Sequence, residues 1–108
     1  MFVVMFEFVV KAGQEQAFMT AWGETTQGIY LFKGSLGSRL HRDKSGAFIA
    51  YAQWPDEKTY REANDITMSD GYEKARDAMR SVLDLDATRV LFEMEVETDY
   101  LQRRPFAL

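Results

Sequence analysis

One segment near the amino terminus is apolar on both sides. The residues from 2 to 10 alternate as in a β-strand, with Phe2, Val4, Phe6, Phe8 and Val10 on one side. Val3, Met5, Glu7 and Val9 lie on the other side, where only Glu7 is charged. A strand that is apolar on both faces is typical of a sheet packed between two layers. We therefore expect a central strand with a second layer on each of its faces.

The sequence after this strand predicts a helix, a hairpin and two further helical segments. Apolar residues recur at helical spacing from Phe18 to about Leu31. Two glycines in "FKGSLGS" precede a predicted strand over 36–42, and "RDKSG" joins it to a second strand over 47–54. Pro55 and Asp56 suit the start of a short helix to about residue 63. A longer helix follows, capped by Ser69 or Asp70.

The last regular pattern, over 88–100, predicts a long strand. Apolar residues there alternate with an acidic row that consists of Glu93, Glu95, Glu97 and Asp99. Such a row either supplies oxygen ligands to a hard cation or forms a solvated face that protects a sheet edge. Acidic residues two apart on a strand are about 6 to 7 Å apart, too far for neighbours to chelate one ion alone. We favour the solvated edge.

The order of elements predicts an α+β chain of the ferredoxin-like βαββαβ type. This pattern gives a four-stranded antiparallel sheet with helices on one face, here over residues 1–100 as one domain. The apolar second face of the first strand then needs a cover, and a second copy of the chain is the simplest source. We expect a homodimer, in which the tail over 101–108 contacts the partner.

Composition excludes several classes of function. The chain has no cysteine, so it has neither disulfides nor a cysteine nucleophile. Its net charge of -4 argues against a nucleic-acid partner. The amino terminus lacks a basic region and a cleavage site, and no apolar run reaches the ~20 residues that span a bilayer. We expect a soluble cytoplasmic protein without a membrane partner.

Two polar residues on the predicted strands are candidates for proton transfer. His41, the single histidine, shares a strand face with Arg39 and cannot form a metal site alone. Glu7 sits between Met5 and Val9, and burial there would raise its pKa and make it a base. The alternative is an ion pair with Arg39, or with a basic residue of the partner, that keeps Glu7 ionised. The sequence leaves both open.

Trp54 marks a candidate pocket. It shares a strand face with Phe48, Ala50 and Ala52, and the two small alanines between large rings leave space for a planar aromatic or apolar ligand. The alternative is that side chains of a partner fill this space. Tyr60 lies six residues later in the short helix, so its ring can fold back over the strand end and present its hydroxyl.

The segments "VVMFEFVVKAGQEQAFMTAW" and "GSLGSRLHRDKSGAFIAYAQWPDEKTY" resemble the antibiotic biosynthesis monooxygenase family of dimeric α+β barrels. The resemblance covers about residues 1 to 100. It implies a ferredoxin-like chain that dimerises, with a pocket between sheet and helices in each subunit. Some members oxidise phenolic aromatic substrates with O₂ and no metal or flavin, by deprotonating a phenol so that the substrate reduces oxygen. Others degrade heme.

Matching the family residue by residue gives both agreements and departures. The family tryptophan at the end of the third strand matches Trp54, and the tyrosine of quinone-forming members matches Tyr60. Ala50 stands where those members have an asparagine, and Lys74 where they have an arginine. Glu7 and Asn64 replace the asparagine and histidine of the heme-degrading members, which disfavours heme as a ligand.

These considerations predict a cofactor-independent monooxygenase that acts on a small planar aromatic of the phenol or quinone type. The candidate catalytic residues are Glu7 and Tyr60. The candidate substrate-binding residues are Trp54, His41, Arg39, Phe48 and Lys74. Neither a metal nor another cofactor is expected. The alternatives are a non-catalytic dimeric barrel that binds a small apolar ligand, and an isomerase or decarboxylase in which Glu7 and His41 handle a proton.

Overall fold

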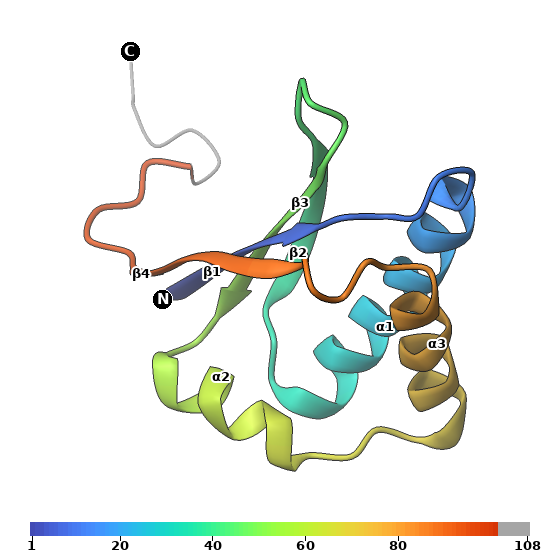
Figure 1. Ribbon diagram of the computed structural model, residues 1–108. Coiled ribbons are helices and arrows are strands. Elements are labelled where there is room, and N and C mark those ends of the chain that lie inside the picture. Colours follow the sequence, from blue (N-terminus) through green and yellow to red (C-terminus); the bar gives the residue numbers. More distant parts are fainter. Residues whose placement is uncertain (102–108) are drawn as a thin grey trace.

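The computed structural model describes residues 1–101 as one antiparallel sheet with three helices on one side of it (Figure 1). The elements are β1 (Phe2–Phe8), α1 (Glu15–Lys33), β2 (Gly37–Arg42), β3 (Phe48–Trp54), α2 (Glu57–Glu62), the 3₁₀ turn η1 (Ala63–Asp65), α3 (Asp70–Ser81) and β4 (Arg89–Glu95). The strand order is β2-β3-β1-β4. This order confirms the ferredoxin-like prediction. Most of the tail that was expected to contact a partner lies outside the described residues.

Local signals in the sequence account for where the helices begin and end. Gly34 ends α1 in the left-handed conformation, with φ of 81°, which glycine adopts without steric cost. The side chain of Asp56 caps α2 by accepting a hydrogen bond of 2.7 Å from the backbone N–H of Thr59. Ser69 precedes α3, although its side chain makes no capping bond.

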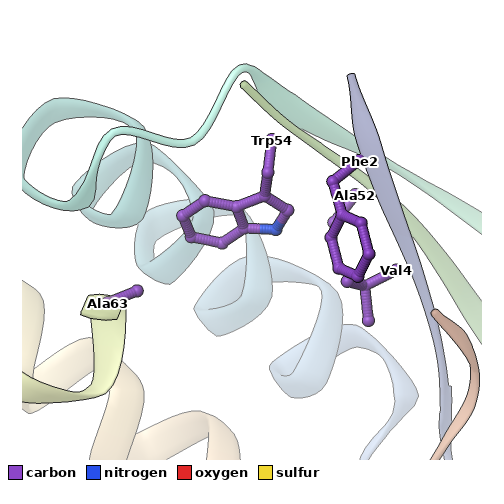
Figure 2. Close-up of a cluster of buried hydrophobic side chains, with 5 residues drawn as sticks. All are labelled: Phe2, Val4, Ala52, Trp54 and Ala63. Carbon is purple, nitrogen blue, oxygen red and sulfur yellow. The ribbon is translucent and has the colours of Figure 1, made fainter. Parts of the chain in front are cut away.

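The register of β1 against β3 directs one face of the sheet toward the helices. Phe2 pairs with Trp54, and Val4 pairs with Ala52. These four side chains and Ala63 form one buried cluster, which Figure 2 shows with the Trp54 indole extending from the sheet toward Ala63. A second buried cluster joins Phe18 of α1 to Phe48 and Leu83.

No described helix covers the other face of the sheet, although Leu101 lines part of it. Met5, Ile49 and Tyr51 line a shallow groove on it, and the Phe92 side chain of β4 is 57% exposed there. All three described helices lie on the opposite side (Figure 1). The second layer expected for β1 is therefore not supplied by residues 1–101, and a second copy remains a prediction.

The edge strand β4 is shorter than the sequence predicts. It ends at Glu95 rather than near residue 100, although the N–H of Val96 still donates to the carbonyl of Met1 at 2.9 Å. The last ladder pair of β4 is Glu95 with Phe2, so the alternation that continues to residue 100 is not matched by pairing. Glu93 and Glu95 lie on the helix side, where Glu93 pairs with Arg61 and Glu95 lies 3.7 Å from the terminal amine of Met1.

None of the helices within residues 1–101 has the length and apolar character needed to cross a membrane. In the same residues, no three histidine, aspartate or glutamate side chains are grouped closely enough to hold a metal ion.

We predict that Gly28 is essential for the packing of α1 against α3. A Cβ at this position would lie 2.7 Å from Cγ of Tyr72, so Gly28→Ala should lower the free energy of unfolding by about 1 to 3 kcal/mol. Gly23 is the matched control, because a Cβ there meets nothing within 4 Å and Gly23→Ala should stabilise the helix by up to about 1 kcal/mol. Urea unfolding of both variants measures this, and equal effects would contradict the close contact.

Candidate functional site

A cavity of about 300 Å³ lies between the helix-facing side of the sheet and the helices. We call it the Trp54 cavity. Its walls combine side chains of β1, β3, α1, α2 and α3, and they include Phe6, Phe8, Trp22, Thr25, Ile29, Lys33, Ala50, Ala52, Trp54, Tyr60, Asn64, Arg76, Met79 and Leu83. Most of this lining is apolar, as in sites for small aromatic ligands. The polar groups are few.

Ala50 and Ala52 leave the open space that the sequence suggested. Both are buried on the helix side of β3, and both line the Trp54 cavity. Because this space lies between the sheet and the helices of the same chain, a partner packed on the open face of the sheet does not reach it. The alternative that partner side chains fill the space next to Ala50 is therefore disfavoured.

Trp54 and Tyr60 form one wall. Their rings meet edge to face with centroids 5.5 Å apart, and the Phe2 ring lies 5.7 Å from that of Tyr60. Trp54 is only 5% exposed, and its indole N–H is buried without an acceptor among the described residues. Such an unpaired donor costs about 1 to 3 kcal/mol. The indole is therefore held in place by packing alone.

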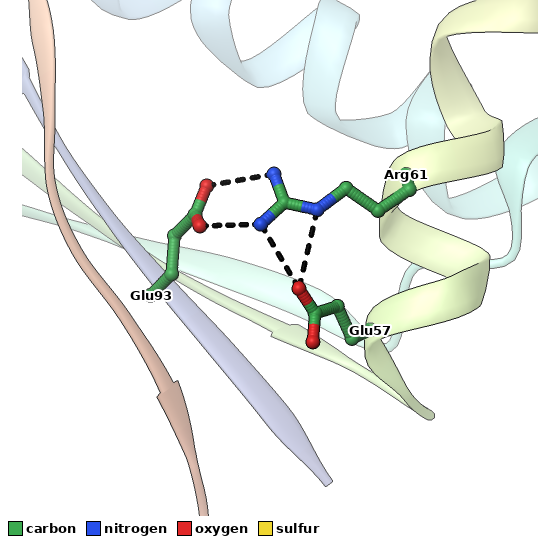
Figure 3. A network of polar contacts seen from close by, with 3 residues as sticks. All are labelled: Glu57, Arg61 and Glu93. Carbon is green, nitrogen blue, oxygen red and sulfur yellow. Dashed lines mark hydrogen bonds and ion pairs between the residues drawn. The ribbon is translucent and has the colours of Figure 1, made fainter.

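The Tyr60 hydroxyl is kept protonated by its surroundings. Burial raises the pKa of Tyr60 above its usual value, the nearby Glu93 carboxylate raises it further, and Arg61 opposes the shift. Arg61 itself is fixed between two carboxylates (Figure 3): its Nη1 donates to Glu93 at 2.9 Å, and its Nη2 donates to Glu57 at 3.0 Å. Tyr60 is therefore a neutral hydrogen-bond donor at physiological pH.

Three basic residues of the Trp54 cavity were not expected from the sequence: Lys33, Arg76 and Arg80. Lys33 is the last residue of α1 and only 8% exposed, and Arg76 reaches the cavity from α3. Burial lowers the pKa of Lys33, the charge of Arg76 lowers it further, and Glu73 opposes the shift. The signal was present, because Thr25, Ile29 and Lys33 repeat every four residues along one helix face.

Two predicted binding residues lie elsewhere. Lys74 is exposed on α3 and does not line the Trp54 cavity, whereas Arg76 does. The helical rotation of two residues, about 200°, explains the difference. Phe48 packs in the buried cluster with Phe18, with ring centroids 5.0 Å apart, and is likewise absent from the cavity lining.

The structure does not bring Glu7, Arg39 and His41 to the Trp54 cavity. Their positions in the strands alternate with those of the cavity residues, so they lie on the open face. Glu7 forms an ion pair, but with Arg89 and not with Arg39: Nε of Arg89 lies 3.2 Å from the carboxylate. The reason is register, because Arg89 pairs directly with Glu7 on β4. Nδ1 of His41 lies 3.2 Å from the carbonyl of Ile49.

Comparisons with known proteins agree with this architecture. A model of the family described as antibiotic biosynthesis monooxygenase matches residues 1–78. The chain belongs to this family. Among curated protein sequences, no match was found.

Solved structures show the same fold at low sequence identity. SnoaB, a cofactor-independent oxygenase from Streptomyces nogalater, superposes with a TM-score of 0.70 at 16% identity, over 94% of this chain and 97% of that one. Rv0793 from Mycobacterium tuberculosis superposes with a TM-score of 0.67 at 12% identity, over 92% of this chain and 97% of that one. At such identities the likeness shows the fold alone.

We predict that the pKa of Tyr60 lies above the usual 10.0 and depends on Glu93. Glu93→Gln removes the negative charge that disfavours the phenolate, so this pKa should fall. Glu95→Gln, on the same strand, is the matched control and should leave it unchanged. NMR titration of ring-labelled tyrosine, with Tyr60→Phe to assign the signal, measures the effect. A Tyr60 pKa at or below 10 in the unaltered chain would contradict the prediction.

Proposed function

We propose that this protein is a cofactor-independent monooxygenase that oxidises a small planar aromatic substrate of the phenol or quinone type in the Trp54 cavity. The observation that carries the proposal is the open apolar space next to Ala50 and Ala52, walled by Trp54 and Tyr60, in a member of this family. The SnoaB fold likeness supports it. We place the reaction in the cytoplasm, as the sequence predicts.

The chemistry requires no external reductant. A ring position of the phenolic substrate becomes a carbonyl carbon with one atom of O₂. The other oxygen atom leaves as water with two hydrogens of the substrate. The electrons come from the substrate, which is most reducing once its phenol is ionised. The protein must therefore bind a flat ring, favour the phenolate and exclude bulk water.

The wall residues are suited to orienting such a ring. The Trp54 indole and the Tyr60 ring meet at an angle, so a planar molecule can stack on one and contact the edge of the other. The neutral Tyr60 hydroxyl interacts with the Glu93 carboxylate, so it donates to a substrate oxygen only by turning away from Glu93. Glu7 does not share this space, because it lies across the sheet paired with Arg89. Any role for Glu7 as a base is therefore confined to the open face.

The two alternatives from the sequence differ in how the structure bears on them. A binding module without catalysis needs only the cavity, and Ala50 in place of the family asparagine is consistent with it. An isomerase or decarboxylase needs Glu7 and His41 together. Both pair with Ile49 from opposite sides, so they are two strand spacings apart, roughly 9 to 10 Å. Oxygen consumption separates the first alternative from the proposal.

We predict oxygen uptake with dihydroxynaphthalenes or anthrones, measured with an oxygen electrode. Tyr60→Phe removes the hydroxyl and should lower the rate about tenfold or more. Ala50→Leu fills the cavity and should abolish uptake. Tyr51→Phe is the matched control, because Tyr51 points to the open face on the same strand.

The pattern of variants decides between the hypotheses. No uptake by the unaltered chain across the panel, with binding retained, would favour the binding module. Uptake that survives Ala50→Leu would place the reaction outside the Trp54 cavity. If Glu7→Gln lowers the rate of oxygen uptake and the cavity variants do not, the reaction takes place on the open face of the sheet.

We also propose that two copies associate through the open face of the sheet. The apolar residues there include Val3, Met5, Ile49, Tyr51, Phe92 and Met94. A monomer would leave Phe92 57% exposed on a strand without a helix to cover it, and burying such rings is the largest available gain. The family resemblance implies the same arrangement.

Light scattering tests the association. We expect a dimer at micromolar concentration, and Phe92→Lys should shift it to monomer because a buried unpaired charge is costly. Tyr30→Lys on α1 is the matched control, since Tyr30 is 56% exposed but lies on a helix. A monomeric unaltered chain would contradict the proposal.

A further inference from the structure

One cation of the Trp54 cavity makes no direct ion pair within the described residues. Lys33 is 8% exposed and makes neither a hydrogen bond nor an ion pair through its side chain with the residues that the structure describes. The Lys33 amine stays accessible to a small molecule, because Trp54 Nε1 is the only fully buried side-chain nitrogen or oxygen without a partner in the described residues. The buried Thr25 hydroxyl, by contrast, is already engaged: it donates to the carbonyl of Ala21 at 2.7 Å.

The neighbours of Lys33 leave this end of the cavity short of negative charge. Arg76 and Arg80 also line the cavity, and the charge of Arg76 acts on Lys33. The one carboxylate that acts on Lys33, Glu73, is shared. It lies 3.9 Å from Arg76 and also accepts a hydrogen bond of 2.9 Å from the backbone N–H of Met68. Tyr60, from α2, is a neutral donor.

We propose that Lys33, with Arg76 beside it, forms an oxyanion-binding end of the Trp54 cavity, so that the ligand is an aromatic molecule bearing a phenolate or a carboxylate. The apolar walls accept the ring, and the oxyanion supplies the missing counterion. The apolar walls lower the local dielectric, which strengthens the attraction of these cations for a bound anion. No site residue from the sequence reasoning had this role.

This assignment rests on the proposed function and adds that the bound substrate is an anion. A cationic end that binds the phenolate and not the phenol lowers the pH at which a bound phenol ionises. The proton leaves to water, and the resulting anion stays paired with the Lys33 ammonium and the Arg76 guanidinium. Lys33 thus takes the place in substrate activation that Glu7 cannot take from the other face.

The test measures binding under nitrogen, so it needs no turnover. The probes are naphthol, naphthoate and the uncharged methoxynaphthalene, followed by calorimetry and by the absorbance band of naphtholate. Lys33→Met keeps the length of the side chain without its charge. It should weaken binding of naphthoate or naphtholate about tenfold or more and leave methoxynaphthalene unchanged. In the unaltered chain, bound naphthol should ionise at lower pH than free naphthol, and Lys33→Met should remove this shift.

Two further measurements keep the result decisive. Lys33→Met should melt at about the same temperature, because the Lys33 side chain makes no hydrogen bond or ion pair with the described residues, so lost binding would not reflect unfolding. Lys44→Met, in the exposed turn between β2 and β3, is the matched control and should bind every probe as before. Selectivity for naphthoate alone identifies a carboxylate ligand, and a lowered naphthol midpoint identifies a phenolate; both support an oxyanion site.

The contrary outcomes are distinct from failure of the monooxygenase. Oxyanion selectivity without oxygen uptake would overturn the proposed reaction and keep this site. Oxygen uptake and anion binding that are unaffected by Lys33→Met would overturn this site and keep the reaction. Equal weakening of all three probes would show that Lys33 acts through packing, and no binding of any probe to the unaltered chain would overturn both.

Discussion

The pairing of β1 with β3 is the constraint on which the rest of the structure depends. The two strands are antiparallel with Phe2 opposite Trp54 and Phe8 opposite Phe48. Since side chains alternate across a sheet, this single register decides which residues meet the helices and which meet the open face. A shift by one residue would turn Ala50, Ala52 and Trp54 outward and remove the cavity. The position of β1 in the middle of the sheet, between β3 and β4, fixes the register from both sides.

The cavity itself comes from small residues placed among large ones. Phe6 and Phe8 on β1 and Trp22 on α1 keep the layers apart, and Ala50 and Ala52 fail to fill the resulting space. Larger apolar residues at the two alanines would bury more surface, so the open space is retained at a cost in stability. Tyr72 packs against Gly28 where α1 and α3 meet. Neither residue lines the cavity, so these two helices pack closely outside it.

The fold and the Trp54 wall were predictable from the sequence because their signals are local. Alternation and helical spacing predict the bounds of the strands and helices to within about two residues at most ends. The spacing of six residues between Trp54 and Tyr60 predicts the contact between their rings. What failed depended on partners distant in the chain. Arg89 pairs with Glu7 because β4 is the neighbour of β1. Lys74 follows from its distance in sequence from Trp54, which does not indicate the side of the helix on which a residue lies. The end of β4 was missed because it depends on where its partner strand begins.

The ion pairs of Arg61 with Glu57 and Glu93 affect how firmly one side of the Trp54 cavity is held. The segment from α2 to η1 forms a side of the cavity through Tyr60 and Ala63, yet α2 has no fully buried residue. Its link to β4 is the exposed bond between Arg61 and Glu93, and exposed charge pairs weaken as ions are added. This side of the cavity is therefore held to β4 in part by an exposed charge pair, and rising ionic strength should weaken that attachment.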